Sequence, residues 1–345
     1  MIFPRLGVST MNTFAVMKVV MVLFIIVSGW VVLSGRIESI PDPNASFRNT
    51  FAGSSSSTYD YATALFSVLN SYTGWSNASY VLNEVNNPVR TLKIAGPLGL
   101  GICTVMYLLA NVSYYAAATP AEVAASGVTV ASLFMDKVFG EGMRRAFSFF
   151  IALSAFGNVT TVTFSQSRVN QELAKEGVIP FPRFWASSWP TGAPSAGLLL
   201  HFIPSFIVII AIPFRDAYDF IIDVEGYPGS IVDLRVVVGL FWLRYTQPNL
   251  HRPFRCWYPV AAFYLVCQAF LVVAPFVRPP GGGTDDDLPY YLYSVVGIVV
   301  LVFGVLYWAV WRKVLPAMGR YRLEPVHYKL QDGTSVVVYE KNKQV

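Results

Sequence analysis

The chain has 345 residues, of which 54% are hydrophobic and 13% are charged, and its mean hydropathy is +0.49. A soluble domain carries about 25% charged residues, so this composition indicates a polytopic membrane protein. The net charge of +5 does not indicate nucleic-acid binding, because the basic residues lie in loops between apolar runs rather than in one patch. The three cysteines fit no metal-binding or disulfide pattern, and we expect no metal and no cofactor.

Eight apolar runs are long enough to cross a bilayer. They cover approximately residues 12–34, 60–85, 94–117, 144–168, 194–213, 219–243, 257–277 and 289–311. The first run predicts a membrane span rather than a cleavable signal peptide, because it is too long for a signal core and lacks a small-residue cleavage site. We therefore expect an all-α membrane helical bundle over residues 1–311 and a cytosolic tail over residues 312–345.

Lys18 lies inside the first run, near its start. A lysine in this position can extend its ammonium group to the membrane surface along its aliphatic stem. Alternatively it is a functional charge, because ionisable side chains within spans are costly and commonly mark transport pathways. The residues alone leave both interpretations open.

The second run is interrupted in its middle by polar, small and aromatic residues. These are Ser71, Tyr72, Thr73, Gly74 and Trp75. Hydroxylated residues and Gly lower helix propensity, and unwound backbone inside a membrane is tolerated where it lines a protein cavity. Many secondary transporters bind small solutes at such discontinuous helices. An ordinary helix with a Gly at a packing contact is the alternative.

The distribution of basic residues predicts an orientation. One set of loops carries Arg5, Arg90, Lys93, Arg168, Lys175, Arg183, Arg244, Arg252, Arg255 and the tail from Arg312 onward. The opposite loops carry fewer basic residues, although Arg144 and Arg145 weaken the contrast. We therefore expect both termini in the cytosol and the Asn44-Ala45-Ser46 glycosylation sequon outside.

The tail contains a hairpin signal. Asp332 and Gly333 lie between two short runs of β-prone residues, within residues 328–339. An Asp-Gly pair in this position is typical of a tight turn between antiparallel strands. We expect a hairpin, although an isolated hairpin is only marginally stable in water.

Several motifs, in chain order, resemble L-type amino-acid transporters of the APC superfamily. Residues 83–92, after the break at Gly74 and Trp75, resemble the family's sixth helix. Residues 168–180 resemble the segment after helix eight, 250–254 the turn between helices ten and eleven, and 307–316 the end of helix twelve. Across its whole length the chain is most similar to the fungal high-affinity methionine permeases. This resemblance implies the APC fold and proton-coupled uptake of a neutral amino acid, methionine first, at the plasma membrane.

The resemblance also implies a gap. The family has twelve helices, and this chain resembles helices five to twelve, so we expect an N-terminally truncated bundle without helices one to four. In the family, the unwound parts of helices one and six hold the amino acid together, and Ser71 to Trp75 match only the second of these. Lys18 matches a lysine of helix five that replaces a sodium ion in proton-coupled relatives. We therefore expect no coupled transport by residues 1–345 alone.

Two later runs carry further polar residues. Ser154, Asn158 and Thr161 recur at roughly helical spacing on the family's eighth helix, and they either contact substrate or form hydrogen bonds between helices. Asp233 and Arg235 lie inside a span, where charges are costly, and at this spacing they do not face each other. We interpret this pair as sequence drift or as groups that meet other partners, and drift is the favoured interpretation.

The predicted function is amino-acid transport and not enzymatic catalysis, since no catalytic constellation is recognisable. The expected partners are a neutral L-amino acid, a proton and the lipid bilayer, with another permease chain as an optional partner and no nucleic acid. The alternative is a non-transporting membrane protein, such as a nutrient sensor, a partner of a full-length permease or a truncated gene product.

Overall fold

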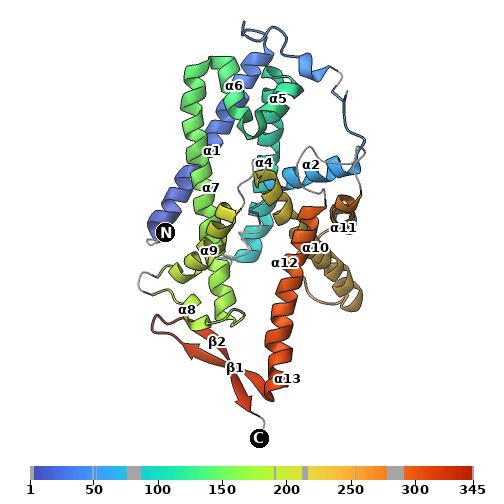
Figure 1. The fold of residues 1–345 in the computed structure, drawn as a ribbon. Helices are drawn as coiled ribbons and strands as arrows, with labels where there is room; N and C mark the ends of the chain where they lie inside the picture. Colours follow the sequence, from blue (N-terminus) through green and yellow to red (C-terminus); the bar gives the residue numbers. More distant parts are fainter. Residues whose placement is uncertain are drawn as a thin grey trace. The chain divides into compact units, whose positions relative to one another are not determined.

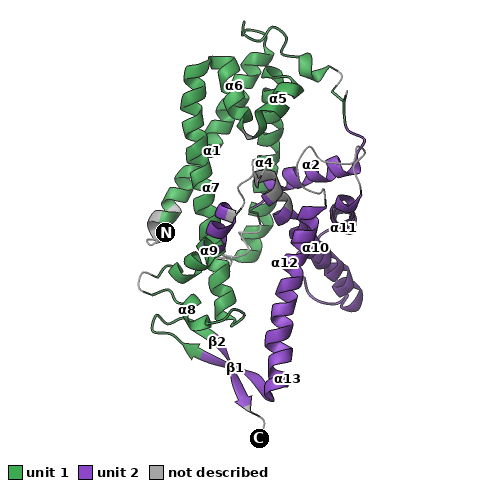
Figure 2. Cartoon of the chain, in the orientation of Figure 1, with its two compact units in different colours: residues 1–54, 74–202, 328–336 green, residues 55–73, 203–327, 337–345 purple. Residues whose placement is uncertain are grey.

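A computed structural model describes residues 4–48, 50–51, 53–75, 87–189, 192–211, 217–252, 254–277 and 291–343 (Figure 1). The chain forms two compact units (Figure 2). The first unit comprises residues 1–54, 74–202 and 328–336, and the second comprises residues 55–73, 203–327 and 337–345. Each unit is mainly helical.

The helices of the first unit are long spans joined by short helices. They are α1 (Pro4–Leu33), η1 (Ala45–Phe47), α4 (Pro88–Ala117), α5 (Pro120–Ser126), η3 (Gly127–Thr129), α6 (Val130–Phe139), α7 (Glu141–Lys175), α8 (Pro182–Trp185) and the start of α9 (Ser195–Ala211). Helix α1 packs against α4, α6 and α7. The buried cluster includes Val32, Ala116, Phe134 and Phe147.

A glycine sets the spacing between α1 and α4. A Cβ atom added at Gly29 would overlap the Cβ and Oγ atoms of Ser113 and lie 2.7 Å from the Ser113 Cα. Ser113 is fully buried at this contact. The two helices therefore approach each other more closely than any larger residue at position 29 permits, as small residues allow in membrane helix packing.

The second unit gathers its helices around an aromatic core. Its helices are α2 (Thr58–Ser71), the end of α9, α10 (Ala217–Thr246), α11 (Tyr258–Val273), η4 (Ala274–Phe276), α12 (Leu292–Ala309), the π-helical turn η5 (Val310–Val314) and α13 (Leu315–Gly319). Helix α10 packs against α2, α11 and α12. The buried cluster contains Tyr59, Phe66, Tyr227, Leu271 and Tyr293.

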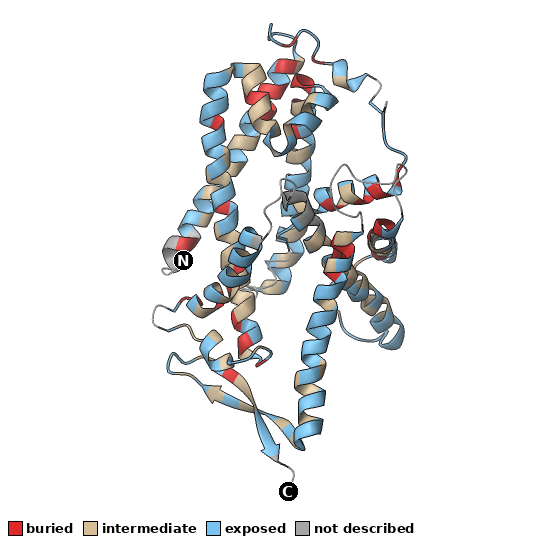
Figure 3. Ribbon diagram, in the orientation of Figure 1, coloured by how far each residue is buried: buried red, intermediate tan, exposed pale blue. Residues whose placement is uncertain are grey.

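Six helices of the described residues are long and apolar enough to cross a membrane. They are Ser9–Leu33, Pro88–Ala117, Glu141–Lys175, Val224–Thr246, Tyr258–Phe276 and Leu292–Gly319. Their outward faces carry exposed apolar side chains, as on much of α12 (Figure 3). Such faces match a lipid environment, in which the helices satisfy their own backbone groups. The prediction of a polytopic helical bundle is confirmed.

Two of the eight predicted spans differ from this pattern. The run at 194–213 forms an apolar helix over Ser195–Ile210, which is shorter than the six spanning helices. The run at 60–85 is helical only over Thr58–Ser71, and residues 76–86 lie outside the described part of the chain. At the other end, the last span continues beyond the predicted boundary at 311 and reaches Gly319.

The predicted tail hairpin is confirmed. Strands β1 (Tyr321–Lys329) and β2 (Ser335–Lys343) form a two-stranded sheet, and Gly333 in the turn has φ +82°. In the first unit, the Asp332 carboxylate accepts a hydrogen bond from the Ser188 backbone N–H at 2.6 Å, and the Arg183 guanidinium lies 3.9 Å from the Tyr328 ring centroid. The tip of the hairpin is therefore held by the segment after α7 and does not depend on its own strands alone.

Candidate functional site

The predicted helix interruption lies at the C-terminal end of α2. The helix stops at Ser71, and residues 72–75 form a turn in which Gly74 adopts φ +105°. This φ value is unfavourable for residues with a Cβ atom, so Gly is needed here. The helix therefore ends here instead of continuing through Gly74, and residues 76–86, which complete the predicted discontinuous span, lie outside the described part of the chain.

The hydroxyl groups of this turn bind the end of their own helix. Ser71 Oγ donates to the Val68 carbonyl at 2.6 Å, and Thr73 Oγ1 donates to the Asn70 carbonyl at 2.7 Å. The end of a helix carries partial negative charge from its last carbonyl groups. Such an end suits an ammonium group, which is one of the two charged groups of an amino acid.

Trp75 ends the described part of the turn. Its side chain is 61% exposed. An exposed indole is available to contact a bound solute. A role in substrate contact stays a prediction for Ser71, Tyr72, Thr73, Gly74 and Trp75.

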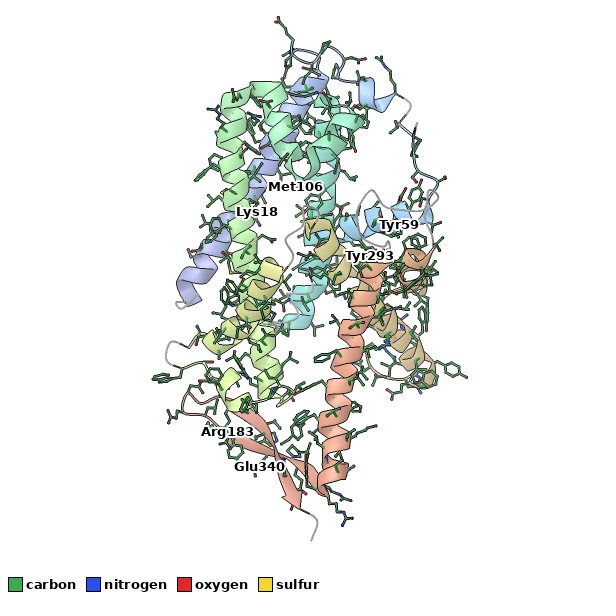
Figure 4. All side chains as sticks on the ribbon, viewed as in Figure 1. Lys18, Tyr59, Met106, Arg183, Tyr293 and Glu340 are labelled. Atoms are coloured by element: carbon green, nitrogen blue, oxygen red, sulfur yellow. The ribbon has the colours of Figure 1, made fainter. Side chains whose placement is uncertain are left out.

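Lys18 lies within the uninterrupted helix α1, and its side chain is half-buried (Figure 4). Helix α4, which carries the labelled Met106, and helix α7 both pack against α1. No carboxylate forms an ion pair with Lys18 among the residues that the structure describes. A cation within a spanning helix is energetically costly, and a functional role for Lys18 stays a prediction.

The contacts between α1 and α7 locate Lys18 along the neighbouring helix. Phe14 lies against Gly157, and further along α1 the Phe24 ring is stacked 6.3 Å from the Phe147 ring, so the two helices run antiparallel. Lys18 lies one turn after Phe14. Ser154 lies one turn before Gly157. Because the helices are antiparallel, Lys18 and Ser154 lie at the same level of this interface.

The three polar residues predicted on α7 do not share one environment. Ser154 and Thr161 are half-buried, and both lie about one turn from Gly157 on the side of α7 that meets α1. Thr161 Oγ1 donates to the Gly157 carbonyl at 3.0 Å. Asn158 is exposed. The structure thus brings Ser154 and Thr161 to the helix that carries Lys18, and it does not bring Asn158 there.

Asp233 has a partner that the sequence did not reveal. Its Oδ2 atom accepts a hydrogen bond of 2.8 Å from the Tyr264 hydroxyl, and Gln268 is hydrogen-bonded to the same hydroxyl. The three residues join α10 to α11. The favoured interpretation of Asp233 as sequence drift is therefore unnecessary, since the second interpretation, a partner elsewhere, accounts for it. No sequence signal linked Asp233 to Tyr264, because the two residues are far apart in the chain.

Comparison with known proteins matches this chain to amino acid permeases. A family model described as amino acid permease matches residues 1–303. The chain is 36% identical to the high-affinity methionine permease of Saccharomyces cerevisiae over 335 residues, which cover 95% of this chain and 58% of that relative. It is 33% identical to the low-affinity methionine permease of the same yeast over 282 residues, covering 81% and 51% of the two chains.

More distant relatives include animal transporters. The chain is 28% identical over 306 residues to the b(0,+)-type amino acid transporter 1 of Rattus norvegicus, covering 88% of this chain and 58% of that relative. The chain therefore spans between half and three fifths of the length of these curated relatives.

Proposed function

This chain belongs to the amino acid permease family. We propose that it takes part in carrying a neutral amino acid across a membrane, with methionine as the first candidate substrate. It is an integral membrane protein of the helical-bundle type. The yeast relatives with the methionine permease names support the choice of substrate. These relatives are permeases and transporters, so they give no support to an enzyme or to the non-transporting alternative.

The interruption after α2 is the observation that carries the proposal. Ser71, Tyr72, Thr73, Gly74 and Trp75 contact the substrate through the backbone of the turn and through the exposed indole. The helix end attracts the substrate ammonium group, because partial negative charge collects there. An apolar side chain such as that of methionine suits a site beside the apolar residues of α2.

Lys18 supplies the coupling to protons. It is a titratable group within an apolar helix, and no described carboxylate neutralises it. Loss or gain of its proton changes the charge at the interface of α1 and α7, which is the kind of change that can bias one arrangement of a transporter over another. Ser154 lies at the same level and can bind substrate or the lysine ammonium group, whereas the exposed Asn158 is the weaker substrate contact.

The protein lies in the plasma membrane with both termini in the cytosol under this proposal. The basic residues of the alternate loops support this orientation. The permease domain then extends past the expected boundary at 311 to Gly319, where the last spanning helix ends, and the residues that follow, up to 345, form a cytosolic tail that contains the hairpin.

Methionine uptake tests the proposed function. The chain is expressed in yeast cells without methionine permeases, both as residues 1–345 and joined to the part of the yeast high-affinity permease that it does not match. We expect the joined chain to restore saturable uptake that is faster at acidic pH, and residues 1–345 alone serve as the comparison. A joined chain that reaches the membrane and transports no neutral amino acid would refute the proposal.

A further inference from the structure

A basic pocket lies where α10 ends and α11 begins. It has a volume of about 550 Å³, and Arg244, Arg252 and Arg255 line it together with Trp257 and Tyr258. We call these five residues the arginine pocket. All of them belong to the second unit.

Two of the arginines are held in place by the backbone. The Arg244 Nη2 atom donates to the Cys256 carbonyl at 2.7 Å, and its guanidinium lies 4.6 Å from the Tyr258 ring centroid. Arg252 donates to the carbonyls of Leu243 and Gln247, at 3.0 and 2.9 Å, at the end of α10. A guanidinium group has five N–H donors, so both arginines keep donors for a ligand.

The pocket has no counter-charge of its own. No carboxylate lines it, and none of its three arginines forms an ion pair within the described ranges of the chain. Arg255 is exposed and makes no hydrogen bond to any described residue. Three like charges around one pocket repel one another, and a bound anion relieves that repulsion. Guanidinium groups match the oxygen geometry of phosphate particularly well.

The position of the pocket along the chain indicates the source of the anion. One span ends at Thr246 and the next begins at Tyr258, so the pocket lies at the boundary between the membrane and water. Trp257 is 78% exposed and Tyr258 is 59% exposed. Tryptophan and tyrosine side chains are enriched at the depth of the lipid headgroups. In the proposed orientation this boundary faces the cytosolic leaflet, which carries the anionic lipids.

We infer that the arginine pocket binds the phosphate of an anionic lipid headgroup. The aromatic side chains lie beside the acyl chains, and the three guanidinium groups surround the headgroup. Soluble phosphate offers the same chemistry without the acyl chains, so a test has to separate the two sources. This inference does not depend on the substrate of the protein, and it can fail while the proposed transport holds.

The test uses the whole chain purified in an uncharged detergent. Short-chain phosphatidylserine, short-chain phosphatidylcholine and inorganic phosphate are titrated separately, and binding is followed by the rise in melting temperature and by native mass spectrometry. We expect phosphatidylserine to bind about tenfold more tightly than phosphatidylcholine. Inorganic phosphate should bind more weakly than either lipid. Arg255→Gln should weaken phosphatidylserine binding about fivefold, and increasing salt should weaken it further.

A matched variant controls for loss of charge alone. Arg90→Gln removes an exposed arginine from the start of α4, on the same predicted side of the membrane, and should leave lipid binding unchanged. Equal binding of the two lipids, or phosphatidylserine binding that Arg255→Gln does not weaken, would overturn the inference. Inorganic phosphate that binds as tightly as phosphatidylserine, and that depends on Arg255, would overturn the lipid assignment in favour of a soluble anion.

Discussion

Helix α2 stops at Ser71 and turns, whereas helix α1 runs without interruption from Pro4 to Leu33 past Lys18. The first region presents backbone and hydroxyl groups, with Ser71 and Thr73 bonded to carbonyls of the preceding turn. The second region presents one titratable side chain within a regular helix. The difference fits the proposed separation of roles, in which the turn contacts the substrate and the lysine responds to protons. Mutations should therefore separate uptake from its pH dependence.

The largest effect is expected for Gly74→Leu in the chain joined to the unmatched part of the yeast relative. Leucine disfavours φ +105° and favours continuation of the helix, at a cost of about 1–3 kcal/mol to the turn. Radiolabelled methionine uptake should fall about 100-fold, to background, with normal membrane insertion. Gly53→Leu is the control, because Gly53 also has positive φ and open space around it but lies in a loop. Unchanged uptake by Gly74→Leu would remove the turn from the site.

A smaller and different effect is expected for Lys18→Met, which keeps an unbranched side chain of nearly the same length and removes the charge. Uptake at acidic pH should fall about tenfold, and the remaining uptake should lose its dependence on pH. Uptake is measured between pH 5 and pH 8. Lys175→Met is the control, since Lys175 lies at the end of α7 and pairs with Glu172 at 2.7 Å. A Lys18→Met protein that keeps the full pH dependence would contradict the division of roles.

Gly157→Ala tests whether the position of Lys18 depends on the contact between α1 and α7. A Cβ atom at Gly157 would lie 2.8 Å from the Phe14 side chain, so Phe14 or one of the two helices must shift. We expect a loss of about 1–2 kcal/mol in stability and a severalfold loss of uptake. Gly142→Ala on the same helix has open space and should be neutral or slightly stabilising. Equal melting temperatures for the two variants would show that the contact does not constrain α1.

Glu122 lies outside both regions, and its replacement should change stability while leaving uptake unchanged. The hydrogen bond from Lys137, followed by those from the backbone and side chain of Thr119, lowers the pKa of Glu122 to about 2. Because this pKa lies below the ordinary value of 4.5, the stabilisation is present above pH 4.5 and is lost as the pH falls toward 2. Glu122 is exposed, so solvent screening limits the effect to about 1 kcal/mol.

The check is thermal unfolding of Glu122→Gln beside the unmodified chain. The melting temperatures should differ at pH 7 and converge near pH 2, and a difference that persists at the lower pH would contradict the assignment. Methionine uptake near neutral pH should be the same for both proteins, since neither the turn nor Lys18 is altered.

Local features of the sequence predicted much of the fold. Long apolar runs predicted eight spans, and six of them are spanning helices in the described residues. The polar residues around Gly74 predicted the end of α2, and Asp332-Gly333 predicted the tail hairpin. These signals act within one segment, through hydropathy, helix propensity and turn geometry. The end of the run at 60–85 lies outside the described residues, and no local signal shortened the run at 194–213 to its observed helix.

The tertiary relations of the candidate site were not predictable in this way. Nothing in the sequence indicated that Ser154 lies level with Lys18, that Phe14 lies against Gly157, or that Tyr264 donates to Asp233. The exposure of Asn158 depends on which side of α7 meets α1, and residue spacing alone does not specify that side. The absence of acidic partners around Arg244 and Arg255 likewise depends on the folded loop, within the part of the chain that the structure describes.

The contact between Gly29 and Ser113 also limits how related sequences can vary. Shortening Ser113 to glycine would not make room for a larger residue at position 29, because the Ser113 Cα itself lies only 2.7 Å from the position of the new Cβ. Two compensating substitutions are therefore not enough, and the backbones of α1 and α4 would have to diverge. The adjacent Trp30 is 54% exposed and has no such restriction. A homologue with a side chain at position 29 should accordingly have a larger distance between the helices equivalent to α1 and α4. The residue at this position therefore predicts how closely these two helices pack in a family member.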